Sequence, residues 1–224
     1  MEIKKVLHQN RGFIAFLLLM FVVRGAVADW YHVPTGSMKP TILEGDYVFV
    51  NKLAYDLHPP FSTHSVLRLS DPKPGDVIVF ESAVADIRLI KRVVGVPGDV
   101  ISMRNNQLIV NGKPLLYERV DAQELHPDFK SSDKLIFHET ISGQAHLLQT
   151  DAFLSSPYGS FSDIVVPKDR YFVLGDNRDN SRDSRFIGFV SRGEIVGRSR
   201  KILLSLNYDN YYLPRLDRIN YPLL

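Results

Sequence analysis

The stretch DIRLIKRVVGVPGD, residues 86–99, decides how the fold is interpreted, because its β-branched and apolar residues are typical of a strand closed by a Pro-Gly turn. Strand alternation places Leu89, Lys91 and Val93 on one face. If that face points inward, the Lys91 ammonium loses water, and desolvation lowers its pKa toward neutral pH. A lysine in such a setting can act as a base. The alternative is a surface lysine whose amine reaches solvent.

Similar runs on both sides of this stretch predict further strands. They cover residues 46–54, 75–82, 99–118, 171–177 and 194–206. Within the third run, Asn111-Gly112 is a strong signal for the two-residue type I′ turn of a hairpin. No long helical pattern with caps follows residue 31. We therefore expect a mainly β fold, antiparallel and similar to a barrel or a sandwich.

The composition excludes several classes of protein. The chain has 224 residues, of which 45% are hydrophobic and 23% charged, as in an ordinary globular domain. Its net charge is +2 and no basic stripe with interleaved aromatics is visible, so we expect no nucleic-acid partner. There are no cysteines, and the histidines lack the spacings typical of zinc sites. We predict neither a metal site nor another cofactor.

The N-terminal segment is first basic and then strongly apolar. Basic residues within residues 1–11 precede the uninterrupted apolar run GFIAFLLLMFVV, residues 12–23. As a helix extended to Trp30, this segment would measure about 28 Å, close to the thickness of the hydrocarbon layer. The sequence therefore predicts one transmembrane helix over residues 12–30, with the N-terminus on the cytoplasmic side.

The residues of this segment leave two other interpretations open. The tripeptide AVA at 26–28 fits the cleavage signal of a secretory signal peptide, which would be removed. A buried core helix is the other alternative, although nothing polar interrupts residues 12–23 and the segment is therefore not amphipathic.

A second unusual stretch, GDNRDNSRDSRFIGFV, spans residues 175–190 and is rich in Asp, Arg, Asn and Ser. A solvated turn is one interpretation. A calcium loop is another, but the EF-hand spacing fails, because counting from Asp176 puts Ser181 where Gly belongs. A third is a buried network of Asp–Arg pairs that supports a site.

Four stretches together resemble one family. PTGSMKPT (34–41), GDYVFVNK (45–52), IKRVVGVPGD (90–99) and GDNRDNSRDSR (175–185) occur in the order and spacing of the bacterial type I signal peptidases, also called leader peptidases. The resemblance covers roughly residues 20–115 and 165–205. It implies a membrane-anchored serine endopeptidase that removes signal peptides from exported preproteins after small residues, at sites of the A-x-A type.

The resemblance also implies the catalytic residues. Ser37 matches the nucleophile and Lys91 the general base, which replaces the histidine of other serine proteases. A neutral lysine can take the hydroxyl proton and later return it to the leaving amine. The backbone N–H of Ser37 and the hydroxyl of Thr35 match the two donors of the oxyanion hole.

Further residues match positions that support the site. Ser181 corresponds to a serine that hydrogen-bonds and orients the base, and Asp183 and Arg185 correspond to a structural pair. We expect the remaining polar residues of these motifs to support the site without carrying protons; they are Asp176, Arg178 and Arg92.

Substrate recognition is expected to use β-augmentation, in which an extended preprotein segment pairs with strand edges. Small pockets would accept Ala-like side chains at the first and third positions before the scissile bond. Apolar residues that are close to Ser37 or Lys91 along the chain are candidates for lining these pockets, although most could equally belong to the core. They are Tyr31, Val33, Pro34, Met38, Ile42, Val48, Leu89 and Ile90.

These expectations divide the chain into four parts. They are a cytoplasmic N-terminus (1–11), a transmembrane anchor (12–30), a β-rich catalytic domain (31–118 and 169–224) and a loop-rich insertion (119–168). The resemblance favours a retained anchor, because tethering keeps enzyme and membrane-bound substrate in one plane. We expect a single-pass protein of the bacterial inner membrane with its catalytic domain on the outer side. Its expected partners are preproteins and the lipid bilayer, and the translocation machinery is a further candidate.

Three rival functions remain. Self-cleaving repressors also use a Ser-Lys pair, but they carry an N-terminal DNA-binding domain or a soluble arm, whereas this chain begins with an apolar segment. A specialised peptidase of the same fold, with a narrow substrate such as a pilin or a conjugation protein, is the main alternative. A non-enzymatic, membrane-anchored β module would leave the coincidence of the four motifs without a reason.

Overall fold

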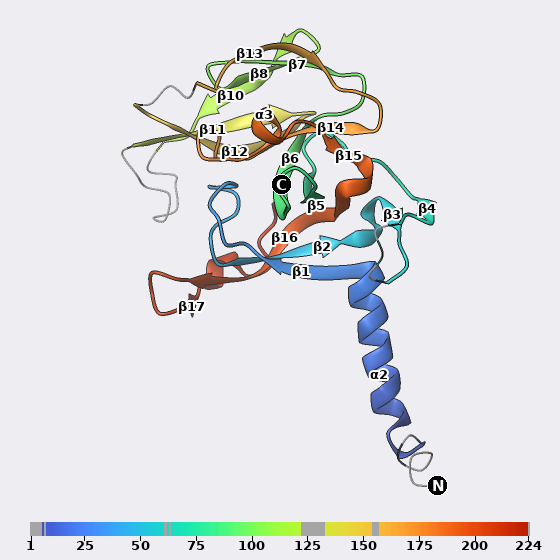
Figure 1. Cartoon of the computed structure of the whole chain (residues 1–224). Helices are drawn as coiled ribbons and strands as arrows, with labels where there is room; N and C mark the ends of the chain where they lie inside the picture. The colour runs from blue at the N-terminus through green and yellow to red at the C-terminus, as the bar shows by residue number, and fades with distance from the viewer. Residues whose placement is uncertain are drawn as a thin grey trace.

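The computed structural model of the protein describes residues 6, 8–60, 62, 64–121, 133–153 and 157–223, and it is mainly β (Figure 1). Its helices are α2 (Arg11–Val22), which continues into a π-helical turn (Val23–Val27), and α3 (Ser184–Ile187). The longer strands are β1 (Ala28–His32), β2 (Asp46–Asn51), β5 (Val77–Ser82), β6 (Ile87–Gly95), β7 (Val100–Arg104), β8 (Gln107–Val110), β10 (Leu116–Arg119), β11 (Lys134–Ile141), β12 (Gln144–Asp151), β13 (Phe161–Val165), β14 (Arg170–Leu174) and β16 (Ile195–Asn207). The two-residue strands are β3 (Asp56–Leu57), β4 (Leu67–Arg68), β9 (Lys113–Pro114), β15 (Val190–Ser191) and β17 (Leu213–Pro214).

One large sheet forms the body of the molecule. Its strands follow the order β1-β2-β16-β5-β6-β14-β15, and β17 pairs with β16. The long strand β16 pairs antiparallel with β2 on one side and with β5 on the other. The predicted mainly β, antiparallel fold is therefore confirmed.

Smaller sheets lie beyond the β6 and β14 end of this body, at the top of Figure 1. One has the order β13-β7-β8-β9 and the other the order β10-β11-β12. The predicted turn joins β8 to β9: Asn111 and Gly112 have φ angles of 52° and 74°, as a type I′ turn requires.

The segment expected to be a loop-rich insertion is more regular than predicted. Within residues 119–168, β11 and β12 pair over their full length, from Lys134↔Asp151 to Ile141↔Gln144. The turn between them is Ser142-Gly143, with φ angles of 50° and 82°. Ser-Gly is a turn dipeptide, and it is the local signal that could have indicated this hairpin.

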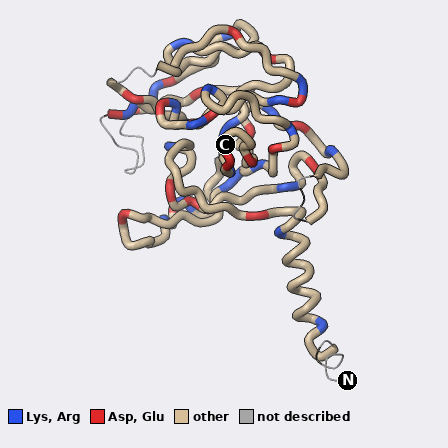
Figure 2. Tube along the Cα trace, in the orientation of Figure 1, with Lys and Arg blue, Asp and Glu red and all other residues tan. Residues whose placement is uncertain are grey.

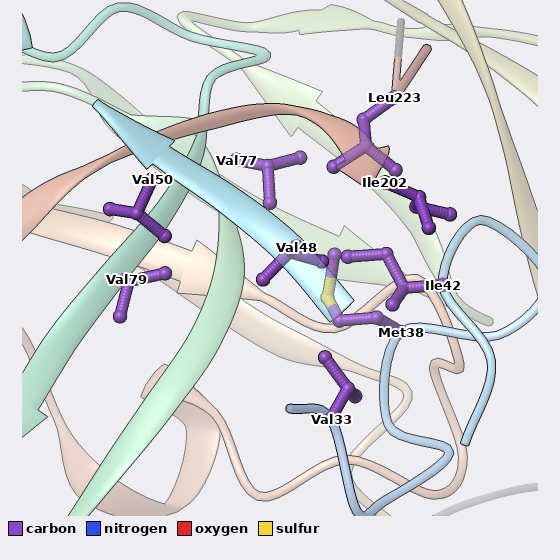
Figure 3. Packing of buried hydrophobic residues seen from close by; sticks show 9 residues of the cluster. All are labelled: Val33, Met38, Ile42, Val48, Val50, Val77, Val79, Ile202 and Leu223. Atoms are coloured by element: carbon purple, nitrogen blue, oxygen red, sulfur yellow. The ribbon is translucent and has the colours of Figure 1, made fainter. Parts of the chain in front are cut away.

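The core nearest to Ser37 is formed by side chains from β2, β5 and β16 and from the loop that connects β1 to β2. Figure 3 shows how this cluster packs: Val33, Met38 and Ile42 of the loop meet the valines of β2 and β5. Burying an Ile or Met side chain contributes about 1.5–3 kcal/mol. The loop is therefore fixed to the sheet by its own apolar residues.

The N-terminal helix projects away from the sheets (Figure 1). No residue of α2 is buried, and Phe13, Leu18 and Leu19 are among its exposed apolar side chains. After Arg11, its first residue, α2 carries no charge along its length (Figure 2).

The predicted transmembrane helix over residues 12–30 does not form as expected. Its last three residues belong to β1, which pairs with β2 from Ala28↔Asn51 to His32↔Tyr47. Backbone pairing at this sheet edge ends the helical conformation at Val27. Within the described residues, no helix combines the length and hydrophobicity needed to cross a bilayer.

Candidate active site

Ser37 lies in the loop between β1 and β2, and its position is fixed from both sides along the chain. Met38 and Ile42 are fully buried in the cluster of Figure 3. The Ile42 N–H donates to the Met38 carbonyl at 2.9 Å, and the Lys39 N–H donates to the Gly36 carbonyl at 3.1 Å. These bonds and contacts hold the Ser37 backbone against the core.

The polar segment that follows β14 (residues 175–185) also binds this loop. The Asn177 N–H donates to the Ser37 carbonyl at 3.1 Å, and Asn177 Nδ2 donates to the Gly36 carbonyl at 3.0 Å. A Cβ at Gly175 would lie 2.4 Å from the Ser37 carbonyl oxygen. Only glycine permits this close approach of the two backbones.

Lys91 points at Ser37 from β6. Its Nζ lies 2.7 Å from Ser37 Oγ and 2.9 Å from the Ile90 carbonyl oxygen. The side chain is 1% exposed, and burial lowers the pKa of Lys91 to about 8, against the opposing charges of Asp183 and Asp176. An appreciable fraction of the amine is therefore neutral near neutral pH and can accept the hydroxyl proton.

A cavity of about 420 Å³ opens at this pair of side chains. Ser37, Lys91 and the exposed Thr35 line it. Six of the eight residues predicted to line a substrate pocket also line this cavity: Tyr31, Val33, Pro34, Val48, Leu89 and Ile90.

The other two predicted lining residues do not reach the cavity. Met38 and Ile42 point into the core instead, because the turn after Ser37 directs them toward β2 and β5 (Figure 3). Gly36 is buried and does not line the cavity either.

Sequence reasoning missed four residues that line the cavity: His32, Val79, Ile87 and Arg88. Ile87 and Arg88 continue β6 away from Lys91, so extending the predicted lining along this strand would have found them. Val79 lies on β5 opposite Ile90, and only the register of that pair places it here.

Arg92, the residue after Lys91, is equally buried but paired. Its Nε and Nη2 donate to the two carboxylate oxygens of Asp176 at 2.9 and 2.7 Å. Thr41 Oγ1 donates to the same carboxylate at 2.6 Å. Burial alone would raise the pKa of Asp176, but the Arg92 charge holds it below its usual value.

A second buried pair joins the polar segment to the β11–β12 hairpin. Arg178 Nη1 donates to Glu139 Oε1 at 3.0 Å and Nη2 donates to Oε2 at 2.5 Å. His146 Nε2 lies 3.2 Å from Glu139 Oε2. Burial would raise the pKa of Glu139, but Arg178 and His146 hold it far below its usual range. Glu139 was not predicted as a partner, because it stands in a region expected to be irregular.

The predicted Asp183–Arg185 pair forms next to α3. Arg185 Nε and Nη2 donate to the Asp183 carboxylate at 2.9 and 2.8 Å, and the Gly175 N–H donates to Asp183 Oδ2 at 3.1 Å. The predicted bond between Ser181 and Lys91 does not form: among the described residues, the buried Ser181 Oγ has no hydrogen-bond partner. It packs against Gly175, where a Cβ would lie 2.2 Å from it.

In the part of the chain that the structure describes, no group of three His, Asp or Glu side chains is arranged to hold a metal ion. The site itself offers a hydroxyl, a buried amine beside it and a mostly apolar cavity.

The chain is similar to a well-defined group of proteins. A family model described as signal peptidase, peptidase S26, matches residues 7–204. Signal peptidase I of Pseudomonas fluorescens is 31% identical over 229 residues, which cover 96% of this chain and 78% of the relative. Signal peptidase I of Pseudomonas aeruginosa is 34% identical, covering 89% and 73%. Signal peptidase I P of Bacillus subtilis subsp. natto is 32% identical and covers 88% of both chains.

A solved structure is also similar in sequence. It is a signal peptidase I from Enterococcus faecalis V583, 29% identical, which matches 58% of this chain and 97% of its own, with a TM-score of 0.37.

Proposed function

The chain belongs to the S26 family of signal peptidases and is a peptidase, and from this premise we propose that it cleaves preproteins through a Ser37–Lys91 dyad. The observation that carries the proposal is the 2.7 Å contact between Lys91 Nζ and Ser37 Oγ inside an apolar cavity. A base must lie within hydrogen-bond reach of the proton that it abstracts, and Lys91 meets this requirement.

The proposed reaction begins with the neutral amine. Lys91 Nζ takes the hydroxyl proton as Ser37 Oγ bonds to the scissile carbonyl carbon, and the carbonyl oxygen becomes an oxyanion. When the C–N bond breaks, Lys91 gives the proton to the departing amine and an acyl-enzyme remains. Water then attacks the ester carbonyl, Lys91 again accepts and returns a proton, and Ser37 is released.

The Thr35 hydroxyl and the Ser37 backbone N–H are the two donors proposed to stabilise the oxyanion. Thr35 lines the cavity next to Ser37, and its side chain is exposed rather than committed to the core. Among the hydrogen bonds of the described residues, none uses the Ser37 N–H. A donor that is in place before the reaction stabilises developing charge without reorganisation.

The preprotein is proposed to bind as an extended strand beside the cavity. β1 is the first strand of the large sheet, and β14 pairs only with Arg92, Val93 and Gly95 of β6. The edge of β6 from Ile87 to Lys91 therefore has no partner strand on that side in the described structure. Branched side chains such as Val33, Val48 and Ile90 line the cavity, and they favour Ala-like substrate residues.

We further propose that α2 inserts its exposed apolar side chains into the cytoplasmic membrane of a bacterium and holds the catalytic domain at that membrane. The exposed apolar side chains of α2 support this proposal, because contiguous exposed apolar surface indicates a lipid or protein contact. Carbonate extraction of the full chain from membranes should leave it in the pellet, and release into the supernatant would refute the anchor.

Cleavage of a preprotein with an A-x-A site tests the enzymatic proposal. The wild-type chain should release the mature protein, identified by its N-terminal residue in mass spectrometry. Ser37→Ala should fold and leave the preprotein intact. If the wild type cleaves a pilin-type precursor and no general preprotein, the specialised peptidase is the correct alternative.

A further inference from the structure

A second cavity, of about 680 Å³, lies beside the Ser37 cavity. Tyr31 and Arg88 line both cavities. The Arg88 guanidinium stacks on the Tyr31 ring, 4.0 Å from its centroid. This stacked pair is therefore the wall that separates the two cavities.

The second cavity is lined by charges of both signs, whereas the charged residues that line the Ser37 cavity, Arg88 and Lys91, are both basic. Lys52 and Arg24 form ion pairs with Asp29 at 3.2 and 3.0 Å. Glu81 pairs with Arg88. Glu194 also lines the cavity, so its three basic residues face three acidic ones. Because these charges balance, the lining suits a ligand with both donors and acceptors and no large net charge. A peptide backbone with polar side chains has this character.

The position of the second cavity relates it to both α2 and the proposed path of the substrate. Arg24 and Gly25, at the end of the helical segment, line its outer side. Asp29 and Tyr31 of β1 line it as well. The unpaired edges of β1 and β6 thus lead from Ser37 and Lys91, past the stacked pair, into this cavity.

The geometry points to a second recognition site for the signal peptide, and we propose that this cavity binds the polar segment immediately upstream of the residues that fill the Ser37 cavity. The inference rests on the proposed function. In a signal peptide the apolar stretch precedes the cut, so the part that enters from the α2 side is the part upstream of the scissile bond.

A lipid headgroup is the competing ligand, since the cavity is near α2 and has charges of both signs. The shared wall with the Ser37 cavity and the two strand edges favour the peptide. A site for a lipid headgroup would require neither the shared wall nor the strand edges.

Gly193 offers a way to fill the cavity without disturbing the fold. It lines the cavity, and a Cβ added there meets no atom within 4 Å. Gly193→Trp should place an indole in the cavity, and Gly193→Ala is the matched control that leaves it open.

The test compares two synthetic peptides in assays of the full chain in detergent. Both share the same A-x-A site, but one ends three residues before the cut and the other extends six polar residues upstream. The wild type and Gly193→Ala should prefer the long peptide. Gly193→Trp should lower kcat/KM for the long peptide by about tenfold, the loss expected for one or two hydrogen bonds. It should leave kcat/KM for the short peptide unchanged.

Each other outcome has a defined meaning. Equal effects of Gly193→Trp on both peptides, or none on either, would overturn the inference while the proposed function stands. Weaker binding of Gly193→Trp to phosphatidylethanolamine vesicles with an unchanged peptide preference would assign the cavity to lipid and also overturn it. If the wild type cleaves neither this pair nor a preprotein, the proposed function itself fails.

Discussion

Lys91 and Arg92 are adjacent residues of β6, both 1% exposed, yet their surroundings differ completely. Arg92 forms a bidentate pair with Asp176. Lys91 has no ion pair with a carboxylate in the described part of the chain, and its amine contacts a hydroxyl and a carbonyl oxygen. One cation is buried with its counter-ion and the other without.

The difference shows how burial affects a basic side chain with and without a carboxylate partner. The carboxylate partner of Arg92 makes this residue a cross-link between β6 and the segment after β14. Without such a partner, burial favours the neutral form of Lys91 and lowers its pKa to about 8. The same strand therefore supplies a structural cation and, at the next position, a candidate base.

Replacing Lys91 should have the largest effect on activity. Lys91→Met removes the proposed base and should lower kcat by on the order of 10⁶, as for other serine proteases that lose the base. Its stability should be unchanged or higher, because an apolar side chain replaces a buried amine. Preprotein cleavage and urea unfolding measure the two effects. A Lys91→Met enzyme that retains cleavage would remove the dyad mechanism.

Replacing Arg92 should mainly affect stability. Arg92→Met leaves the Asp176 carboxylate buried and unpaired, which should lower the free energy of unfolding by about 3–5 kcal/mol. Urea unfolding, with Lys91→Met as the matched control on the same strand, measures the difference. If both variants unfold at the same urea concentration, the contrast between the two cations is wrong.

Removing the proposed oxyanion donor, the Thr35 hydroxyl, should have an intermediate effect on kcat. Thr35→Val removes one hydroxyl at nearly constant volume and should lower kcat by about 10²–10³, with KM nearly unchanged. Thr35→Ser keeps the hydroxyl and should retain most of the turnover. Unchanged turnover in Thr35→Val would assign the oxyanion to another donor.

The smallest expected effect in this comparison is the change of kcat with pH. Because the neutral amine is the active form, kcat should rise about tenfold per pH unit at low pH and level off above the pKa of Lys91, which is about 8. Initial rates between pH 5 and 10 measure the profile. A flat profile would show that Lys91 does not donate or accept the proton in the rate-limiting step.

The sequence predicted the family, the mainly β fold and the residues around Ser37 because each depends on local motifs. Asn111-Gly112 adopts the predicted turn, since turn type is a property of the dipeptide itself. The neighbourhood of Ser37 and Lys91, 54 residues apart, was predicted from the resemblance and not from any pattern within β6.

What the sequence missed depends on contacts between distant segments. Glu139 becomes a partner of Arg178 only after the β11–β12 hairpin has packed against the polar segment. Val79 reaches the cavity through strand register. Ala28, inside the predicted span, joins β1 because Asn51 of β2 is available to pair with it. Hydropathy cannot indicate any of these three contacts.

The direct connection between α2 and β1 has a consequence for where a substrate can be cut. The helical segment ends at Val27 and β1 begins at Ala28, so no linker separates them. The five residues of β1 span about 16 Å at the usual rise. Under the proposed function, β1 sets a constant distance between the end of the helical segment and the loop that carries Ser37. A signal peptide would then be selected by the distance from its apolar stretch to its cleavage site.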